Sequence, residues 1–203
     1  EITWSDDDGD GRLDMEEYSV ADTSTYIGPS LPTFSASLGG ELSLWGWLRV
    51  STLFDHRRGH YQLNDNEQTR CFFSLVAPDR GCAGFDDPAA SLERQAGALA
   101  GTLGDPETGV VSLRGFIHEA DFVKWRELAF TLSAPQAMQA RFPALQGVSL
   151  TLAGRNLRTW TDYPGLDPEI SETGSNTQFG YTQGEFGTQP QVRYWTARVN
   201  VTF

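Results

Sequence analysis

The 203-residue sequence contains no apolar stretch that approaches the roughly 20 residues of a membrane-spanning helix. This excludes a helical membrane protein, but not a transmembrane β-barrel, because barrel strands are apolar on one side only. The sequence also has no serine-nucleophile motif between a strand and a helix, and no pair of carboxylates stands out from its general acidity. We therefore expect no enzymatic activity.

Basic residues are scarce, since 15 lysines and arginines stand against 27 aspartates and glutamates, and the formal net charge is −12. Binding to nucleic acid requires basic patches. The charge balance thus argues against a nucleic-acid partner and favours cations. Aromatic residues make up 12% of the chain and glycines number 21, a composition that favours β structure.

The sequence has only two cysteines, Cys71 and Cys82, and both lie in one segment rich in Gly, Pro and Asp. Their closeness predicts a local disulfide and hence an oxidising compartment, the alternative being two free thiols. The chain begins at Glu1 without an initiator methionine. We therefore expect either a processed chain or part of something longer.

The C-terminal segment, residues 191–203, has the clearest pattern in the sequence. Apolar residues occupy every second position up to Phe203, and polar residues such as Arg198 and Asn200 alternate with them. A period of two predicts a strand. An apolar face opposite a polar one fits lipid on one side and water on the other. An edge strand of a soluble sandwich would alternate similarly.

Earlier segments follow the same pattern and predict an all-β fold of antiparallel strands, as a single domain over residues 1–203. The strand that ends in Phe203 resembles the C-terminal strand of bacterial outer-membrane proteins, which implies that these strands come from the C-terminal end of an outer-membrane barrel. We expect a tight turn at Gly39 and Gly40. One short helix is expected in the segment 56–121, with Asp87 as its N-cap and an end near Gly101. The expected strands are 33–39, 42–55, 122–133, 148–153 and 191–203, with a short stub at 1–4.

The expected connections differ greatly in length. Two are short turns, at 39–41 and about 134–146, whereas the segments 5–32, 56–121 and 158–190 are long. Short and long connections alternate along the chain, so all the long ones would lie at one end of the sheet. This is the pattern of outer-membrane barrels.

Residues 6–17 match the complete twelve-residue calcium-loop pattern. Gly11 stands where such a loop turns sharply, and Arg12 would offer its main-chain carbonyl. Calcium prefers several hard oxygen ligands, and this spacing brings them to one point. The predicted side-chain ligands of Ca²⁺ are Asp6, Asp8, Asp10, Asp14 and Glu17.

The charge of this loop supports the same interpretation. Its twelve residues hold seven acidic side chains and one arginine, a net charge of −6, which is repulsive unless a cation compensates it. The alternative is a solvated acidic turn. The short segment 1–5 before the loop and the prolines after it argue against a helix–loop–helix, so we expect a structural site that rigidifies the segment 5–32.

Several segments together resemble the C-terminal part of SusC/RagA-type TonB-dependent transporters. The aspartate-rich loop from Asp8 to Asp14 is similar to the family pattern DxNGDGxID, and a Gly-Pro-x-Pro entry to a strand follows at Gly28. Residues 122–135 resemble the strand pattern FxRxxxLxLxYxxP. Residues 154–169 match the long and specific pattern GxNLxxxTxYxGxDPE.

The resemblance implies a large barrel in the bacterial outer membrane, or exposed at the cell exterior, that imports oligosaccharide- or peptide-like nutrients. It also implies energy from TonB and a SusD-like surface lipoprotein as lid. The plug and the TonB box of the family are not found in this sequence. About five strands are expected here, whereas a closed barrel requires about eight or more.

A sheet of five strands would leave two edges whose backbone groups need partners. We expect these partners to be the remainder of the barrel or other copies of the same chain. Two alternatives to the transporter therefore stay open. One is a calcium-stabilised structural protein that self-assembles into a filament or ring, and the other is a soluble calcium-binding β domain.

Overall fold

The computed structural model describes residues 1–77, 81–135, 141, 147–170 and 184–203. By backbone contacts the chain divides into two compact units, where the sequence predicts a single domain. The sheet unit comprises Pro32–Arg58, Asp121–Asp162 and Gln191–Phe203. The loop unit comprises Glu1–Leu31, Gly59–Ala120 and Tyr163–Pro190. The loop unit thus gathers the segments that the sequence predicts to be long connections.

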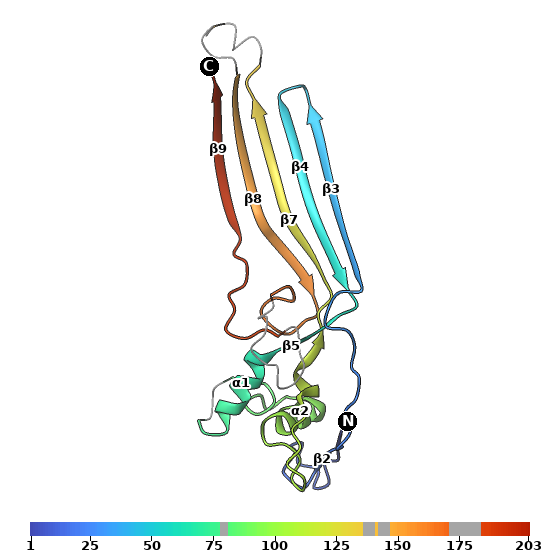
Figure 1. Cartoon of the computed structure of the whole chain (residues 1–203). Helices are drawn as coiled ribbons and strands as arrows, with labels where there is room; N and C mark the ends of the chain where they lie inside the picture. Colours follow the sequence, from blue (N-terminus) through green and yellow to red (C-terminus); the bar gives the residue numbers. More distant parts are fainter. Residues whose placement is uncertain (78–80, 136–140, 142–146, 171–183) are drawn as a thin grey trace. The chain divides into compact units, whose positions relative to one another are not determined.

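The sheet unit is a single five-stranded antiparallel sheet in the order β3-β4-β7-β8-β9 (Figure 1). Each strand pairs with the strands that precede and follow it along the chain within this sheet, which confirms the predicted all-β antiparallel class. Strands β3 and β9 form its two edges. The strands are β3 (Phe34–Leu44), β4 (Leu48–Arg58), β7 (Phe122–Ser133), β8 (Gly147–Thr161) and β9 (Tyr194–Thr202).

The turn of the first hairpin does not lie where the sequence predicts it. Gly39 and Gly40 continue strand β3 and pair with Leu53 and Thr52. The chain turns instead at Trp45 and Gly46, whose φ angles are 53° and 73°. Two consecutive positive φ angles give a turn whose twist matches that of the flanking strands. The two glycines therefore do not form a turn, and the prediction of a turn at 39–41 is wrong.

The predicted turn over 134–146 and the middle of the segment 158–190 fall largely outside the described residues. Within the sheet, a bulge interrupts the pairing of β7 and β8. The pairing shifts between Trp125 and Glu127, so that Asn156 and Leu157 of β8 oppose the single residue Arg126. Asn156 has a φ of 52°, which accommodates the extra residue.

The loop unit contains two small sheets and two α-helices. Strand β1 (Ile2–Trp4) pairs with β2 (Tyr18–Val20), and β5 (Tyr61–Leu63) pairs with β6 (Ile117–Glu119). The helices are α1 (Asp65–Ser74) and α2 (Leu92–Thr102), and a 3-10 turn, η1, covers Leu113–Phe116. Within the described residues, no helix is both long enough and apolar enough to cross a membrane.

Helix α2 corresponds to the one predicted helix, but it begins later. Its N-cap is Ser91, whose side chain accepts the N–H of Arg94 at 3.3 Å. Asp87 instead caps the preceding turn, where its carboxylate accepts the N–H of Ala89 at 2.9 Å. The sequence missed α1, because the apolar side chains of this helix, Phe72 and Phe73, are exposed and form no buried stripe.

Two hydrophobic clusters hold the loop unit together, and α2 contributes to both. One cluster surrounds the disulfide and includes Ala98 of α2. The other joins the N-terminal segment to the opposite side of the same helix. The first cluster consists of Leu63, Cys71, Cys82, Ala98, Leu113, Phe116 and Ile117, and the second of Leu13, Tyr18, Val20, Ala96, Leu99 and Ala100.

Candidate functional site

Three of the predicted calcium ligands lie together in the loop between β1 and β2. Carboxylate oxygens of Asp6, Asp8 and Asp10 all lie within 4.8 Å of one another. The Asp6 carboxylate also accepts the N–H groups of Gly9 at 2.8 Å and of Gly11 at 3.1 Å, which folds the loop around it. Gly11 has a φ of 79°, as expected for the sharp turn. A group of three carboxylates suits a hard cation such as calcium.

Asp14 and Glu17 are not among the carboxylates gathered in this group. Glu17 is only 9% exposed and closes the loop by hydrogen bonds instead. One of its oxygens accepts the N–H of Asp7 at 2.7 Å, and the other accepts the N–H of Asp14 at 3.1 Å. The N–H of Arg12 donates to the carboxylate of Asp10 at 2.7 Å. The structure therefore brings together three of the predicted side-chain ligands, whereas the Glu17 carboxylate binds the backbone N–H groups of the loop.

The elements on either side of the acidic loop are strands. Ile2 pairs with Val20 at the base of the β1-β2 hairpin, and the N–H of Ser5 donates to the carbonyl of Glu17 at 2.9 Å. This agrees with the prediction that no helix–loop–helix is present. The loop is held by its own hairpin and by α2, not by a pair of flanking helices.

Two buried polar side chains fix this hairpin to α2 and to the chain that follows it. The Gln95 amide accepts the N–H of Leu13 at 2.9 Å and donates to the carbonyl of Gly11 at 3.0 Å. The Asp105 carboxylate accepts the N–H of Val20 at 2.6 Å. This hydrogen bond, with others from Thr108, lowers the pKa of Asp105 to about 2. Neither residue was identified from the sequence, because their partners lie more than eighty residues away.

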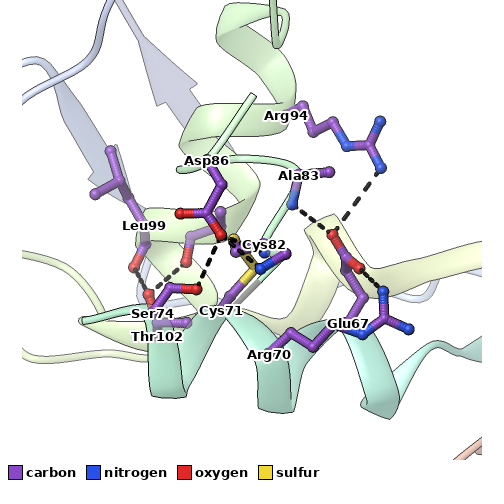
Figure 2. The surroundings of a disulfide bond; sticks show 12 residues. Glu67, Arg70, Cys71, Ser74, Cys82, Ala83, Asp86, Arg94, Leu99 and Thr102 are labelled. Atoms are coloured by element: carbon purple, nitrogen blue, oxygen red, sulfur yellow. Dashed lines mark hydrogen bonds and ion pairs between the residues drawn. A yellow bond between two sulfur atoms is a disulfide. The ribbon is translucent and has the colours of Figure 1, made fainter. Parts of the chain in front are cut away.

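The structure contains the predicted disulfide between Cys71 and Cys82. Both cysteines are fully buried, and two carboxylates hold the backbone beside them (Figure 2). Asp86 accepts the N–H of Cys82 at 2.8 Å, and Glu67 accepts the N–H of Ala83 at 2.9 Å. These hydrogen bonds hold the backbone at Cys82 and Ala83 in place beside the disulfide.

A cleft of about 1380 Å³ lies within the loop unit, between the N-terminal segment and the region around α2 and η1. Aromatic side chains such as Tyr26 and Tyr61 line it together with groups of both charges, including Glu67, Arg94 and Arg114. Burial and the two arginines lower the pKa of His118, which also lines the cleft. The mixed lining favours neither an anionic nor a cationic ligand.

In the sheet unit, cross-strand partners form rows of side chains that run over all five strands, and near the β3–β4 turn two apolar rows flank a polar one. Successive rows point to opposite faces of the sheet. This part of the sheet therefore has one apolar and one polar face. An apolar row consists of Leu44, Leu48, Leu132, Leu150 and Val199, the next row of Ser43, Arg49, Thr131, Thr151 and Arg198, and the third of Leu42, Val50, Phe130, Leu152 and Ala197.

The comparisons with known proteins agree with this geometry. No protein-family model matches the chain. It is 33% identical over 90 residues to the TonB-dependent receptor P3 of Formosa agariphila, a match that covers 43% of the chain and 9% of that receptor. It is 23% identical over 209 residues to the TonB-dependent receptor P26 of the same organism, covering 98% of the chain and 19% of the receptor. The chain is related to the TonB-dependent receptors.

The fold of this TonB-dependent receptor relative is also that of a solved transporter. The structure of the RagAB peptide importer in the open-open state superposes on the whole chain with a TM-score of 0.57 and 19% identity, over 22% of the importer chain. The chain thus spans less than a quarter of the length of each of these proteins. The predicted resemblance to SusC/RagA-type transporters is confirmed.

The same relatives also bear on two further predictions, the lack of enzymatic activity and the location. They are receptors and importers, not enzymes, in agreement with the expected lack of catalytic activity. They are outer-membrane proteins, in agreement with the predicted location in the bacterial outer membrane.

The segment 154–169, which carries the most specific resemblance to this family, has an identifiable structural role at several positions. A Cβ at Gly154 would lie 2.5 Å from the Trp195 ring and 2.8 Å from Leu157, so a larger residue there would force these side chains to move. Asn156 forms the bulge, and its side-chain amide donates to the carbonyl of Val192 at 3.2 Å. These residues join β8 to the chain that enters β9.

The second half of the same segment binds the buried carboxylate of Glu185, which no pattern in the sequence indicates. Glu185 is fully buried and accepts the N–H groups of Leu166 at 2.8 Å and Asp167 at 3.2 Å. Its other oxygen accepts the side-chain amide of Asn66 at 2.7 Å. Burial, together with Glu185, raises the pKa of Tyr163. In this TonB-dependent receptor relative, Glu185 therefore ties three distant parts of the loop unit together.

Proposed function

We propose that the chain forms part of the wall and the surface loops of an outer-membrane transporter that takes up nutrients of the oligosaccharide or peptide type. The observation that carries this proposal is the alternation of apolar and polar rows across all five strands. In a barrel wall the apolar face contacts lipid and the polar face lines a water-filled interior.

The exposure of the apolar rows supports this assignment. Val199 and Leu42 are 65% and 57% exposed. Apolar side chains at these positions would be covered by acyl chains in a membrane. The opposite face carries Arg49 and Arg198 among hydroxyl groups, which require water or polar partners.

The partners follow from the edges of the sheet. Within the part of the chain that the structure describes, strands β3 and β9 each have one neighbour. Each unpaired backbone group in lipid costs several kcal/mol. We propose that the remaining strands of the barrel pair with both edges. The RagAB peptide importer, which shares the fold, supports peptide-like nutrients and a SusD-like surface lipoprotein as partner. A self-assembling filament gains no support from these relatives.

We further propose that Ca²⁺ binds the acidic loop as a structural ion. Asp6, Asp8 and Asp10 would hold it, because their oxygens are already grouped within 4.8 Å. The Arg12 carbonyl, Asp14 and Glu17 complete the donor set of the sequence pattern. The bound ion would neutralise the mutual repulsion of the carboxylates and so rigidify the loop.

The position of the sheet in the membrane is tested by a matched pair of substitutions on β8. Leu150 lies in an apolar row and Thr151 in the adjacent polar row. Leu150→Asp places a charge on the lipid face, which is destabilising near the bilayer centre, so outer-membrane assembly should fall strongly. Thr151→Asp should assemble normally. Equal assembly of both variants would contradict the proposed orientation.

Nutrient uptake is tested in the native bacterium by deletion of the gene that encodes this chain. Growth on oligosaccharides or on peptides as sole nutrient should fail, and the wild-type gene should restore it. The Leu150→Asp gene should not restore growth, whereas the Thr151→Asp gene should. Normal growth of the deletion strain on every oligosaccharide and peptide supplied would contradict the proposed uptake.

Calcium binding is tested by titration calorimetry of the purified protein in detergent. Asp8→Asn removes a carboxylate of the grouped set and should weaken binding at least about tenfold, which corresponds to about 1.4 kcal/mol. The matched control is Asp7→Asn, because Asp7 belongs to the same loop but not to the ligand set. Calcium binding that is absent from the wild type, or is equal in both variants, would contradict the proposed site.

A further inference from the structure

Helix α2 carries two consecutive side chains that bind different parts of the loop unit. Gln95 binds the acidic loop, whereas Arg94 forms an ion pair with Glu67 beside the disulfide. We propose that α2 couples calcium binding at the acidic loop to the Cys71–Cys82 disulfide, with Gln95 as the positioning residue. This inference rests on the proposed calcium site and concerns the effect of that site on the rest of the loop unit.

Gln95 is well placed to position the loop. It is 7% exposed, and both ends of its amide are used. It binds the N–H of Leu13 and the carbonyl of Gly11, the two residues that flank Arg12, and it also donates to the carbonyl of Ala90 at 3.0 Å. Because the Arg12 carbonyl belongs to the proposed ligand set, a change in the loop backbone at this point reaches Gln95 directly.

Hydrophobic packing reinforces the same connection. Leu13 of the acidic loop is 8% exposed and belongs to one cluster with Ala96 and Leu99 of α2. Interior packing is dense, so a buried side chain that loses its position disturbs its neighbours. The loop therefore cannot rearrange at Leu13 without altering its contacts with α2.

The other side of α2 packs against the disulfide region. Ala98 belongs to the cluster that contains Cys71 and Cys82, and the Arg94 guanidinium lies 4.0 Å from the Glu67 carboxylate (Figure 2). Glu67 in turn accepts the N–H of Ala83, next to Cys82. The close approach of α2 continues at Gly97, where a Cβ would lie 2.9 Å from the backbone of Gly115.

These contacts link two events that are far apart in the sequence. A reductant reaches the two buried sulfur atoms only after the surrounding segment opens. A ligand that binds the closed form stabilises it against such opening. Calcium at the acidic loop should therefore slow reduction of the disulfide, and by linkage the coupling should also strengthen calcium binding.

The experiment measures reduction of the Cys71–Cys82 disulfide by dithiothreitol in the full chain, with saturating calcium or with a chelator, followed by thiol labelling. Calcium should slow reduction of the wild-type protein by about tenfold, within the usual range of coupling between sites. Gln95→Met preserves the side-chain volume but removes the amide. It should still bind calcium, with reduced affinity, and calcium should no longer slow reduction. Glu93→Ala, an exposed change on the same helix, should behave as wild type.

Hydrogen exchange of the wild-type protein provides a second measurement that requires no variant. Calcium should slow amide exchange over α2 and residues 81–86. If the wild type binds calcium but reduction and exchange do not respond, or if Gln95→Met retains the full response, the coupling is wrong while the calcium site stands. If the wild type binds no calcium, both the site and the coupling are wrong.

Discussion

The Asp105 carboxylate accepts the N–H of Val20 at 2.6 Å, and this hydrogen bond joins residues 85 positions apart in the sequence. Asp105 also accepts the N–H and the hydroxyl of Thr108, at 2.8 and 2.9 Å. These donors stabilise the charged carboxylate and hold its pKa near 2, below the ordinary 3.8. Burial, with a further contribution from Asp105, raises the pKa of the nearby Tyr18 hydroxyl.

Asp105→Asn should destabilise the loop unit at neutral pH, because the amide directs a donor toward other donors. A folded-state pKa below the unfolded one means that the stabilisation is present above pH 3.8 and is lost as the pH falls towards about 2. The difference between wild type and variant should therefore shrink over that range. Urea unfolding followed by the helical circular dichroism signal measures it, with the exposed Asp22→Asn as control. A difference independent of pH would contradict this explanation.

Gly46→Ala should weaken the β3–β4 hairpin. The φ of 73° places this residue in the left-handed region, where alanine is less stable than glycine by about 1–2 kcal/mol because of its Cβ. Gly40→Ala is the matched control in the same hairpin, since its added Cβ would meet nothing within 4 Å. Urea unfolding of the detergent-bound protein should show a lower midpoint for the first variant only. Equal midpoints would place the turn elsewhere.

Gly154→Ala should separate β8 from β9 locally. The new methyl group would lie 2.5 Å from the ring of Trp195, and such overpacking typically costs about 1–3 kcal/mol. Gly147→Ala lies on the same strand, where the nearest atoms are 3.9 Å away, and should be nearly neutral. Tryptophan fluorescence and the unfolding midpoint would both report the change. An unchanged midpoint for Gly154→Ala would show that Trp195 moves aside freely.

Glu185→Gln should destabilise the loop unit by about 1.5–3 kcal/mol, the usual contribution of hydrogen bonds to a charged group. The glutamine NH₂ would face either the side-chain amide of Asn66 or the N–H groups of Leu166 and Asp167, all of which are donors. Unfolding by urea measures the loss. The exposed Glu107→Gln should leave the midpoint unchanged, and an equal effect of both substitutions would refute the proposed role of Glu185.

The first hairpin shows what the alternation of apolar and polar residues could predict and what it could not. The expected strand 42–55 has a period of two that puts Leu42, Leu44, Leu48 and Val50 on one face. They do share a face, although the chain turns at Trp45 and Gly46 where the strand was expected to continue. The turn spans an odd number of residues, so Leu44 pairs with Leu48 and the alternation continues as if no turn were present. Alternation alone therefore could not locate the turn. The turn was predicted at Gly39-Gly40 because consecutive glycines are typical of tight turns.

The acidic loop shows a second limit of the same kind. The spacing of Asp6, Asp8 and Asp10 correctly indicated that their side chains would lie together. It did not indicate that Glu17 would bind the backbone of the loop, or that Gln95 would hold it from another helix. Calcium binding itself stays a prediction.

The sequence by itself determined the sheet strands apart from the position of the first turn, the disulfide, and the resemblance to TonB-dependent transporters. Each of these depends on residues close together in the chain: a period of two, a pair of nearby cysteines, and contiguous motifs. Only the tertiary structure decided that the long connections form a compact unit around α2. That unit is held by buried side chains such as Gln95, Asp105 and Glu185, whose partners are brought near by folding. Such contacts leave no periodicity in the sequence, since one hydrogen bond between distant residues constrains only the two positions that make it.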